Sequence, residues 1–198
     1  MKAAVVRTGA GNLYSLAVAL ERIGVVPEVV DTPEQLRGRD RVILPGVGEA
    51  RGAMDFLVRR RLDRALLALR VPVLGICLGM QLLCGWSEEG DTPGLGVFDL
   101  DVQRFRGGEK VPHTGWNRVE GLKGNLFKGI SAGAWFYFVH GFRAKPSPWT
   151  TAVCEHMGPF SAALERKNFF GVQFHPEKSG VAGSRLLRNF CYGGMSDD

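Results

Sequence analysis

Two short stretches of the sequence carry residue types suited to nucleophilic catalysis. In VLGICLGMQLL, Cys77 stands between Gly75 and Gly79, and in VQFHPEK, His175 is followed two positions later by Glu177. A thiol, an imidazole and a carboxylate can form a nucleophilic triad, in which the carboxylate orients the imidazole and the imidazole takes the proton of the thiol. We therefore treat Cys77, His175 and Glu177 as candidate catalytic residues.

The stretch around Cys77 predicts a sharp turn from a strand into a helix. An apolar run at 71–76 precedes the cysteine, and apolar residues at helical spacing follow it. The pattern G-x-nucleophile-x-G removes side chains that would clash beside such a turn and leaves the nucleophile exposed above the edge of the sheet. The N-terminus of the following helix favours a thiolate. The remaining cysteines have no such setting, and we interpret them as small buried hydrophobic residues: Cys84, Cys154 and Cys191.

Alternating strand and helix patterns predict how the two stretches are brought together. Apolar runs at 2–6, 25–30, 41–44 and 71–76 alternate with helical patterns at 13–23 and 49–69. Further strand-like runs at 98–102, 134–139, 150–154, 161–164 and 169–174 precede a closing helix at 179–192. We predict an α/β fold with an open, mostly parallel sheet, helices on both faces and antiparallel additions in the second half. Carboxyl ends of neighbouring parallel strands share one crevice, so Cys77 and His175 can meet there.

Length and composition narrow the class of protein. The 198 residues predict one domain spanning 1–198, with 45% hydrophobic and 23% charged residues as in soluble globular proteins. No apolar run is long enough for a secretion signal or a membrane span, so we expect a cytoplasmic protein with free thiols. The net charge of +5 is dispersed and accompanies no nucleic-acid motif, so we expect neither a nucleic-acid nor a membrane partner. A basic cluster is interpreted as a solvated helix face, with docking to an acidic protein as the alternative: Arg59, Arg60, Arg61 and Arg64.

Two rival chemistries fit the sequence less well. His175-x-Glu177 matches the H-x-E of zinc deaminases, but the sequence lacks the P-C-x-x-C that supplies their other ligands. It contains no C-x-x-C at all, which argues against a structural zinc site. The glycines of PGVGEARG, residues 45–52, do not match the dinucleotide pattern G-x-G-x-x-G. This loop could instead direct backbone N–H groups at developing negative charge, or it could be only a tight turn.

Three blocks together resemble the class I, triad-type glutamine amidotransferases. These blocks are PGVG at 45–48, GICLGMQLL at 75–83 and FHPEK at 174–178. PHTGWN at 112–117 and FYFVHGF at 136–142 resemble one subfamily, the glutaminase subunit of imidazole glycerol phosphate synthase from histidine biosynthesis. The resemblance implies a flavodoxin-like fold and a reaction that needs neither a cofactor nor a metal.

The resemblance also implies roles for individual residues. Cys77 would attack the side-chain amide of glutamine and form a glutamyl thioester, with His175 moving protons and Glu177 orienting it. Ammonia would leave first, and hydrolysis would then release glutamate. Four residues would contribute the oxyanion hole: Gly46, Val47, Gly48 and Leu78. Gln81 and Glu89 would bind glutamine, the alternatives being a solvated helix residue and an ordinary loop charge.

A partner follows from the same resemblance. The family couples this glutaminase, as a heterodimer, to a (β/α)₈-barrel cyclase subunit that receives the ammonia and makes imidazole glycerol phosphate and aminoimidazole carboxamide ribotide. Four residues would face this partner or act as a gate: Trp116, Asn117, Tyr137 and Lys178. A buried core tryptophan and a solvated lysine are the alternatives for Trp116 and Lys178. Thr114 and Gly141 depart from the family pattern, which bears on partner contact and closure of the glutamine pocket.

Other functions stay open at the level of sequence. The chain could be the glutaminase of another pathway, such as pyridoxal phosphate or aminodeoxychorismate synthesis. It could also be a cysteine hydrolase of γ-glutamyl compounds, or a binding module that keeps the fold without catalysis.

Overall fold

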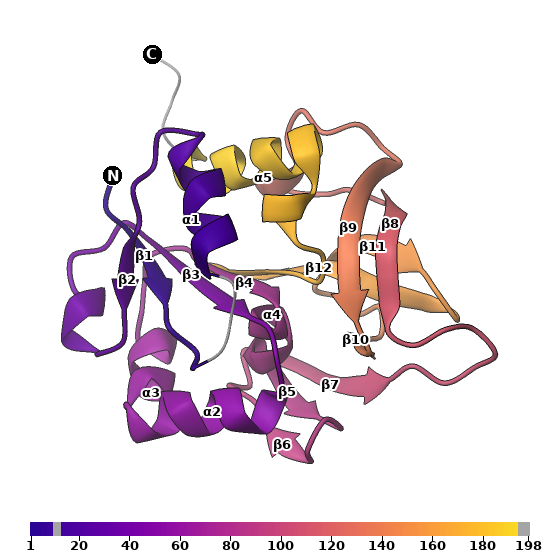
Figure 1. The fold of residues 1–198 in the computed structure, drawn as a ribbon, viewed down its shortest axis with the longest axis horizontal. Coiled ribbons are helices and arrows are strands. Elements are labelled where there is room, and N and C mark those ends of the chain that lie inside the picture. The colour runs from indigo at the N-terminus through magenta and orange to yellow at the C-terminus, as the bar shows by residue number, and fades with distance from the viewer. Residues whose placement is uncertain (10–12, 194–198) are drawn as a thin grey trace.

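The apolar runs of the first half form adjacent parallel strands in the computed structural model, which describes residues 1–9 and 13–193 (Figure 1). Within these residues, a nine-stranded sheet has the order β2-β1-β3-β4-β13-β12-β11-β8-β9. Its parallel strands are β1 (Ala3–Val6), β2 (Glu28–Val30), β3 (Arg41–Gly46), β4 (Val73–Cys77) and β13 (Phe169–Val172). They place the carboxyl ends of β3, β4 and β13 side by side.

The second half extends this sheet with antiparallel strands, as predicted. They are β8 (His113–Glu120), β9 (Ala134–His140), β11 (Thr150–Glu155) and β12 (Pro159–Arg166). The large sheet thus has four parallel and four antiparallel pairings. The predicted α/β class is confirmed.

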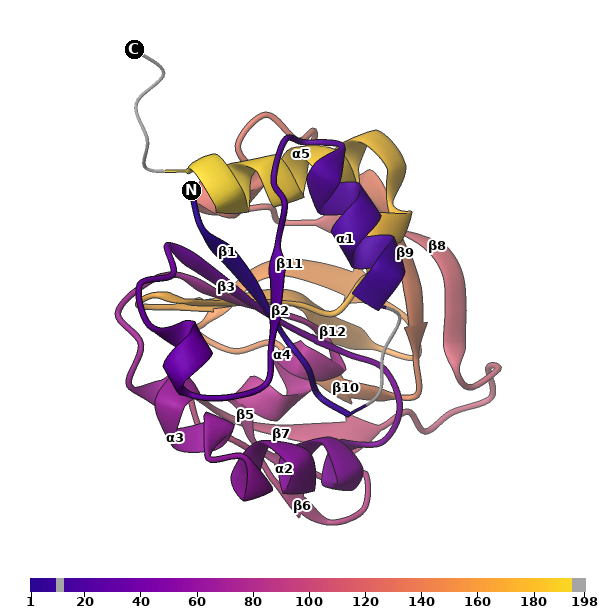
Figure 2. The same ribbon diagram turned by 60° about the vertical axis from the view of Figure 1, so that its left-hand side comes forward.

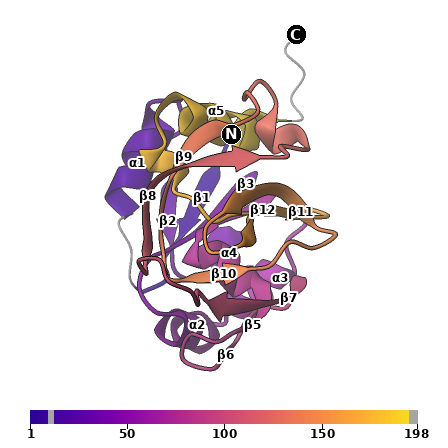
Figure 3. The ribbon, with the colours of Figure 1, turned by 90° about the vertical axis from the view of Figure 1, so that its right-hand side faces the viewer.

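A second, four-stranded sheet lies below the large one (Figure 3). It contains β5 (Cys84–Ser87), β6 (Thr92–Pro93), β7 (Phe98–Arg104) and β10 (Phe142–Ala144), in the order β10-β7-β5-β6. The strand expected at 98–102 therefore does not extend the large sheet. It pairs with β5 and β10 instead, because β5 leads the chain out of the large sheet immediately after the helix that follows Cys77.

Helices cover both faces of the large sheet (Figure 2). One face carries α1 (Leu13–Glu21) and α5 (Gly180–Tyr192), and the other carries α2 (Ala50–Arg59), α3 (Leu62–Leu67) and α4 (Leu78–Leu83). The described residues also contain three short 3₁₀ helices: η1 (Glu34–Leu36), η2 (Asn125–Phe127) and η3 (Pro176–Lys178). None of the helices in the described residues is long and apolar enough to cross a membrane.

The single helix predicted over 49–69 is wrong. Arg61 has a left-handed backbone, with φ of 57°, and a left-handed residue cannot continue a right-handed helix. The chain turns there, so α2 ends at Arg59 and α3 begins at Leu62. Both helices nevertheless bury leucines in the same core, which is why the apolar pattern runs on across the break.

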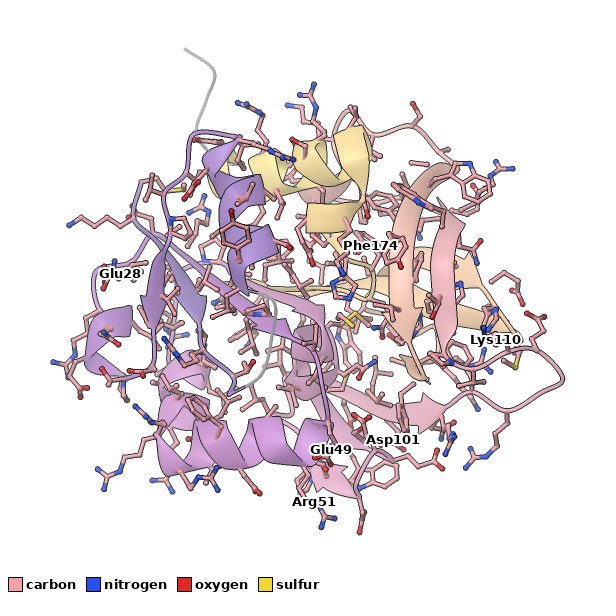
Figure 4. All side chains as sticks on the ribbon, in the orientation of Figure 1. Glu28, Glu49, Arg51, Asp101, Lys110 and Phe174 are labelled. Carbon is pink, nitrogen blue, oxygen red and sulfur yellow. The ribbon has the colours of Figure 1, made fainter. Side chains whose placement is uncertain are left out.

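The two faces of the sheet carry separate cores. The core under α1 and α5 is rich in phenylalanine and contains Phe136, Phe138, Phe160 and Phe174, all fully buried. Figure 4 shows Phe174 at the centre of the molecule, below α5. This residue lies directly before His175, so the packing of this core fixes the backbone from which the imidazole projects.

Candidate active site

Cys77 lies at the sharp turn that its two flanking glycines predict. It is the last residue of β4 and directly precedes α4, with φ of 54° and ψ of −111°, an unusual conformation for a residue with a side chain. A Cβ on Gly75 would approach the backbone of Gly79 to 2.7 Å, and a Cβ on Gly79 would overlap the carbonyl oxygen of Leu44 on β3. The glycines thus allow α4 to start against the sheet and hold Cys77 at its edge.

His175 reaches the same edge from the neighbouring strand. β13 runs parallel to β4, with Val172 opposite Ile76, so the residues that follow the two strands emerge together. The backbone N–H of His175 donates to the carbonyl of Tyr137 at 2.9 Å, and the hydroxyl of Ser179 donates to the carbonyl of His175 at 2.6 Å. These bonds fix the backbone on both sides of the imidazole.

Glu177 orients the imidazole. Its Oε1 lies 2.7 Å from Nδ1 of His175, and both side chains are almost completely buried. A carboxylate can only accept a hydrogen bond, so Nδ1 of His175 carries the proton and donates the hydrogen bond to Glu177. Nε2 is then the nitrogen available to the thiol. Within the described residues, Nε2 is buried and makes no hydrogen bond of ordinary geometry. Burial lowers the pKa of His175, but its interactions with Cys77 and Glu177 outweigh burial, and the net pKa is raised.

Polar groups that sequence reasoning missed also contact the thiol. The Nε2 atom of Gln173 lies 3.7 Å from Sγ of Cys77, and the carbonyl oxygen of Val139 lies 3.8 Å from the same sulfur. Gln173 is fully buried and accepts at Oε1 from Nε2 of Gln81, at 3.0 Å. A signal existed in the sequence, because Gln173 is the one polar residue in the apolar run FFGVQF.

A cavity of about 190 Å³ opens beside the thiol. Pockets for drug-sized ligands usually hold about 300–1,000 Å³, so this cavity suits a smaller molecule. It is lined by Val47, Gly48, Cys77, Leu78, Gln81, Glu89, Val139, His140, Gly141 and Phe142. Among the predicted oxyanion residues, Gly46 does not line it. Gly46 is buried opposite Cys77 in the sheet register, and a Cβ there would meet Cβ of Leu78 at 2.8 Å.

The two predicted glutamine contacts, Gln81 and Glu89, are held in place by the fold. Gln81 is buried and donates from Nε2 to the carbonyl of Phe142 at 3.1 Å. Oε2 of Glu89 accepts from the backbone N–H of Ala50 at 3.0 Å, in the first turn of α2. Burial raises the pKa of Glu89, the bond from Ala50 opposes this, and the neighbouring charge of Glu49 reinforces it. Neither side chain is therefore a freely solvated surface group.

The start of α2 is crowded with capping groups. The side chain of Glu49 accepts from the backbone N–H groups of Arg51 and Gly52, and Figure 4 shows Glu49 and Arg51 together at this helix end. Two carboxylates, Glu49 and Glu89, thus satisfy N–H groups that the helix itself leaves unpaired. This fixes Glu89 against the cavity.

Three of the four residues assigned to a partner surface lie together. The rings of Trp116 and Tyr137 meet edge to face with centroids 6.1 Å apart, and Nζ of Lys178 lies 5.7 Å above the Tyr137 ring. Trp116 is 52% exposed, which removes the alternative of a buried core tryptophan. Asn117 lies apart from them, because its side chain bonds to His113. Its role toward a partner stays a prediction.

Comparison with known proteins identifies the family. The family model of class I glutamine amidotransferases matches residues 4–193.

The chain belongs to the class I glutamine amidotransferases.

Within this family, the chain is 50% identical to a Bacteroides fragilis (strain YCH46) protein named imidazole glycerol phosphate synthase subunit HisH, over 96% of this chain and 98% of that protein. It is 48% identical, with the same coverage, to the protein of that name from Escherichia coli (strain K12). Solved structures share the amidotransferase fold. A Thermoplasma acidophilum protein described as a GMP synthase subunit has a TM-score of 0.74 at 23% identity, covering 96% of this chain and 92% of that one. A glutamine amidotransferase from Thermotoga maritima has a TM-score of 0.67 at 18% identity, covering 97% of this chain and 96% of that one.

Proposed function

We propose that this amidotransferase is the glutaminase subunit of an imidazole glycerol phosphate synthase, and that Cys77, His175 and Glu177 hydrolyse glutamine to glutamate and ammonia. The observation that carries the chemistry is the placement of Cys77 beside a small cavity, at the end of β4, next to the strand that presents the buried His175–Glu177 pair. The relatives named HisH, about half identical over nearly the whole chain, support the assignment to this synthase.

The arrangement accounts for each proton of the reaction. Nε2 of His175 takes the thiol proton, and the Cys77 thiolate attacks the amide carbon of glutamine. The imidazolium then donates its proton to the leaving nitrogen, so that ammonia departs and a glutamyl thioester remains. Water attacks the thioester after giving a proton to Nε2, and the thiol leaves with that proton as glutamate forms. Glu177 keeps the proton on Nδ1 throughout, so Nε2 always faces the reaction.

The cavity offers groups for the negative oxygen and for the rest of the substrate. The backbone N–H of Leu78 at the start of α4 and those of the Val47–Gly48 loop are the proposed oxyanion donors. Gly48 has φ of 103°, a backbone conformation that glycine adopts readily. Glu89 presents a carboxylate suited to the α-ammonium group of glutamine. Nε2 of Gln81 already donates to Phe142 and Gln173, so Gln81 offers Oε1 as an acceptor for an N–H group of the substrate.

A partner subunit completes the proposed function. Ammonia released into water at neutral pH is mostly protonated and no longer a nucleophile, so it must pass directly to a second active site. We assign this second site to a (β/α)₈-barrel cyclase subunit. The surface formed by Trp116, Tyr137 and Lys178 is the proposed docking region, because exposed aromatic residues often supply most of the binding energy in interfaces.

A glutaminase assay tests the proposal. The purified chain is incubated with glutamine alone, with a barrel cyclase subunit, and with that subunit plus its ligand, and glutamate is measured. We expect glutamate release that rises with the partner. Cys77→Ala should abolish release while binding of the cyclase persists, which separates a catalytic subunit from a purely regulatory module. Absence of glutamate under all three conditions would reject the proposed function.

A further inference from the structure

Histidines that the proposed chemistry does not use form part of one wall of the substrate cavity and pack behind it. His113 on β8 stands opposite His140 on β9 in the strand register, and His156 stacks on His113 with centroids 4.2 Å apart. Phenylalanines surround them: Phe105, Phe138 and Phe160. His140 belongs to the segment 139–142 that lines the cavity. The cluster therefore supports one wall of the site from behind.

Hydrogen bonds in the cluster run in one direction. The Phe142 carbonyl can only accept, so Nδ1 of His140, 2.7 Å away, must carry the proton. Nε2 of neutral His140 must then accept, and the donor is Nδ1 of His113 at 3.1 Å. Nε2 of His113 accepts in turn from the amide of Asn117 at 3.2 Å. The amide cannot be reversed, because Oδ1 of Asn117 accepts from the backbone N–H of Arg118 and its Nδ2 also donates to the Glu155 carbonyl.

This chain of bonds requires two neutral imidazoles, and the surroundings provide them. Burial, reinforced by the neighbouring histidines, lowers the pKa of His140 to about 3 and that of His113 to about 4. The carboxylate of Glu109 pairs with Nδ1 of His156 at 3.0 Å and with neither of these two rings, and the charge of His175 lowers the pKa of His140 further. His113 and His140 are thus fixed donors and acceptors near neutral pH.

This series of hydrogen bonds ends at atoms of the proposed active site. The Phe142 carbonyl that accepts from His140 also accepts from Nε2 of Gln81. Gln81 in turn donates to Gln173, whose amide contacts the Cys77 thiol. One network therefore joins Asn117 on β8 to both the cavity wall and the nucleophile.

We propose that His113 and His140 are positioning residues for glutamine hydrolysis. Their bonds, each with a fixed donor, hold the 139–142 segment and the Phe142 carbonyl in the geometry that binds glutamine. Neither imidazole hydrogen-bonds to the Cys77 thiol in the described residues, and the two rings act through Phe142 and Gln81. This inference rests on the proposed glutaminase function.

Two nearly isosteric variants of His113 provide the test. Asparagine places its Nδ2 close to the position of the imidazole Nδ1 and keeps a donor for His140, whereas leucine has a similar shape and no donor. Each variant is assayed for glutamine hydrolysis in complex with the cyclase subunit. We expect His113→Asn to stay close to wild type. We expect His113→Leu to lower kcat/KM about tenfold, mainly through a higher KM, because a buried acceptor loses its donor.

Alkylation of Cys77 by iodoacetamide separates positioning from general damage. Without glutamine, both variants should react close to the wild-type rate, because Gln173 still contacts the thiol even where the Val139 carbonyl shifts with its segment. Glutamine should protect wild type and His113→Asn at similar concentrations, while His113→Leu should need about tenfold more. Equal protection of the leucine and asparagine variants would overturn the inference, as would a tenfold change in the alkylation rate of His113→Leu without glutamine.

Nitrogen NMR of the wild-type protein provides a measurement independent of any variant. The network predicts that both His113 and His140 are neutral and carry the proton on Nδ1, and a proton on Nε2 of either ring would overturn the inference. If wild type itself neither hydrolyses glutamine nor is protected by it, the proposed function fails and the inference falls with it. If wild type is active but the leucine variant matches it, only the inference fails.

Discussion

Replacement of Gly79 by alanine tests how the turn positions Cys77. Gly79 lies inside α4, where alanine is intrinsically favoured over glycine by about 1 kcal/mol. The structure predicts the opposite outcome. The new Cβ would overlap the carbonyl oxygen of Leu44 and lie 2.8 Å from its carbonyl carbon, and both atoms belong to the backbone of β3. No side-chain rotation relieves this contact, so α4 and β3 must move apart.

The sizes of the two opposing effects decide whether Gly79→Ala raises or lowers the free energy of unfolding. Forced overpacking costs roughly 1–3 kcal/mol, and an obstacle of backbone atoms places Gly79→Ala near the upper end. After the helix preference is subtracted, the free energy of unfolding should fall by about 2 kcal/mol. With a urea m-value of about 2 kcal/mol per molar, the unfolding midpoint drops by about 1 M. A shift of about 1 Å at Cys77 should also lower glutamine hydrolysis by roughly a hundredfold.

Urea unfolding and the glutamate assay measure the two effects. Gly108→Ala is the matched control, because no heavy atom lies within 4 Å of a Cβ there, and its unfolding free energy should stay within about 0.5 kcal/mol of wild type. If Gly79→Ala is as stable and as active as Gly108→Ala, the steric account of the turn is refuted.

Three further predictions follow from the site. The raised pKa of His175 stabilises the fold fully below about pH 6.5, and this stabilisation is lost as the pH rises above that value. Glu177→Gln should therefore make the free energy of unfolding fall less steeply with pH above about 6.5. Urea titrations at several pH values measure this, and the same pH dependence in the variant and in wild type would contradict the prediction. Gln173→Leu removes the amide that contacts the thiol and should lower kcat about tenfold in the glutamate assay; full activity would show that the contact is unimportant. Trp116→Ala should weaken cyclase binding by about 2 kcal/mol in calorimetry, with little change in the stability of the chain. Trp135 is equally exposed but does not share the contact with Tyr137, so Trp135→Ala should leave cyclase binding unchanged. Equal losses of binding free energy in the two variants would argue against the proposed docking region.

The sequence predicts the parts of the fold that local patterns determine. Apolar runs and helical spacing predict the parallel strands and α1, and the glycines around Cys77 predict the turn. The break between α2 and α3 at Arg61 could not be predicted in this way. The left-handed backbone of Arg61 leaves the apolar pattern of the two helices nearly continuous, so the break is seen only in the packed structure. The four-stranded sheet could not be predicted either, because the strands that pair with β7 depend on the path of the chain through β5 and not on a local pattern.

The same distinction holds for the candidate site. Cys77, His175 and Glu177 could be proposed because short motifs carry them. The bond between His113 and His140 depends on the register of β8 against β9, which no local pattern fixes. Gln173 gives a weak signal as a polar residue in an apolar strand, but its contact with the thiol needs the parallel pairing of β13 with β4.

The central claim is that Cys77 carries the glutamyl group during turnover. Rapid quenching of the complex with glutamine, followed by mass spectrometry of the digested chain, tests it most directly. We predict a glutamyl adduct on the peptide that contains Cys77 and none in Cys77→Ala. Release of glutamate with no adduct on this peptide, or with the adduct on another cysteine, would contradict the account.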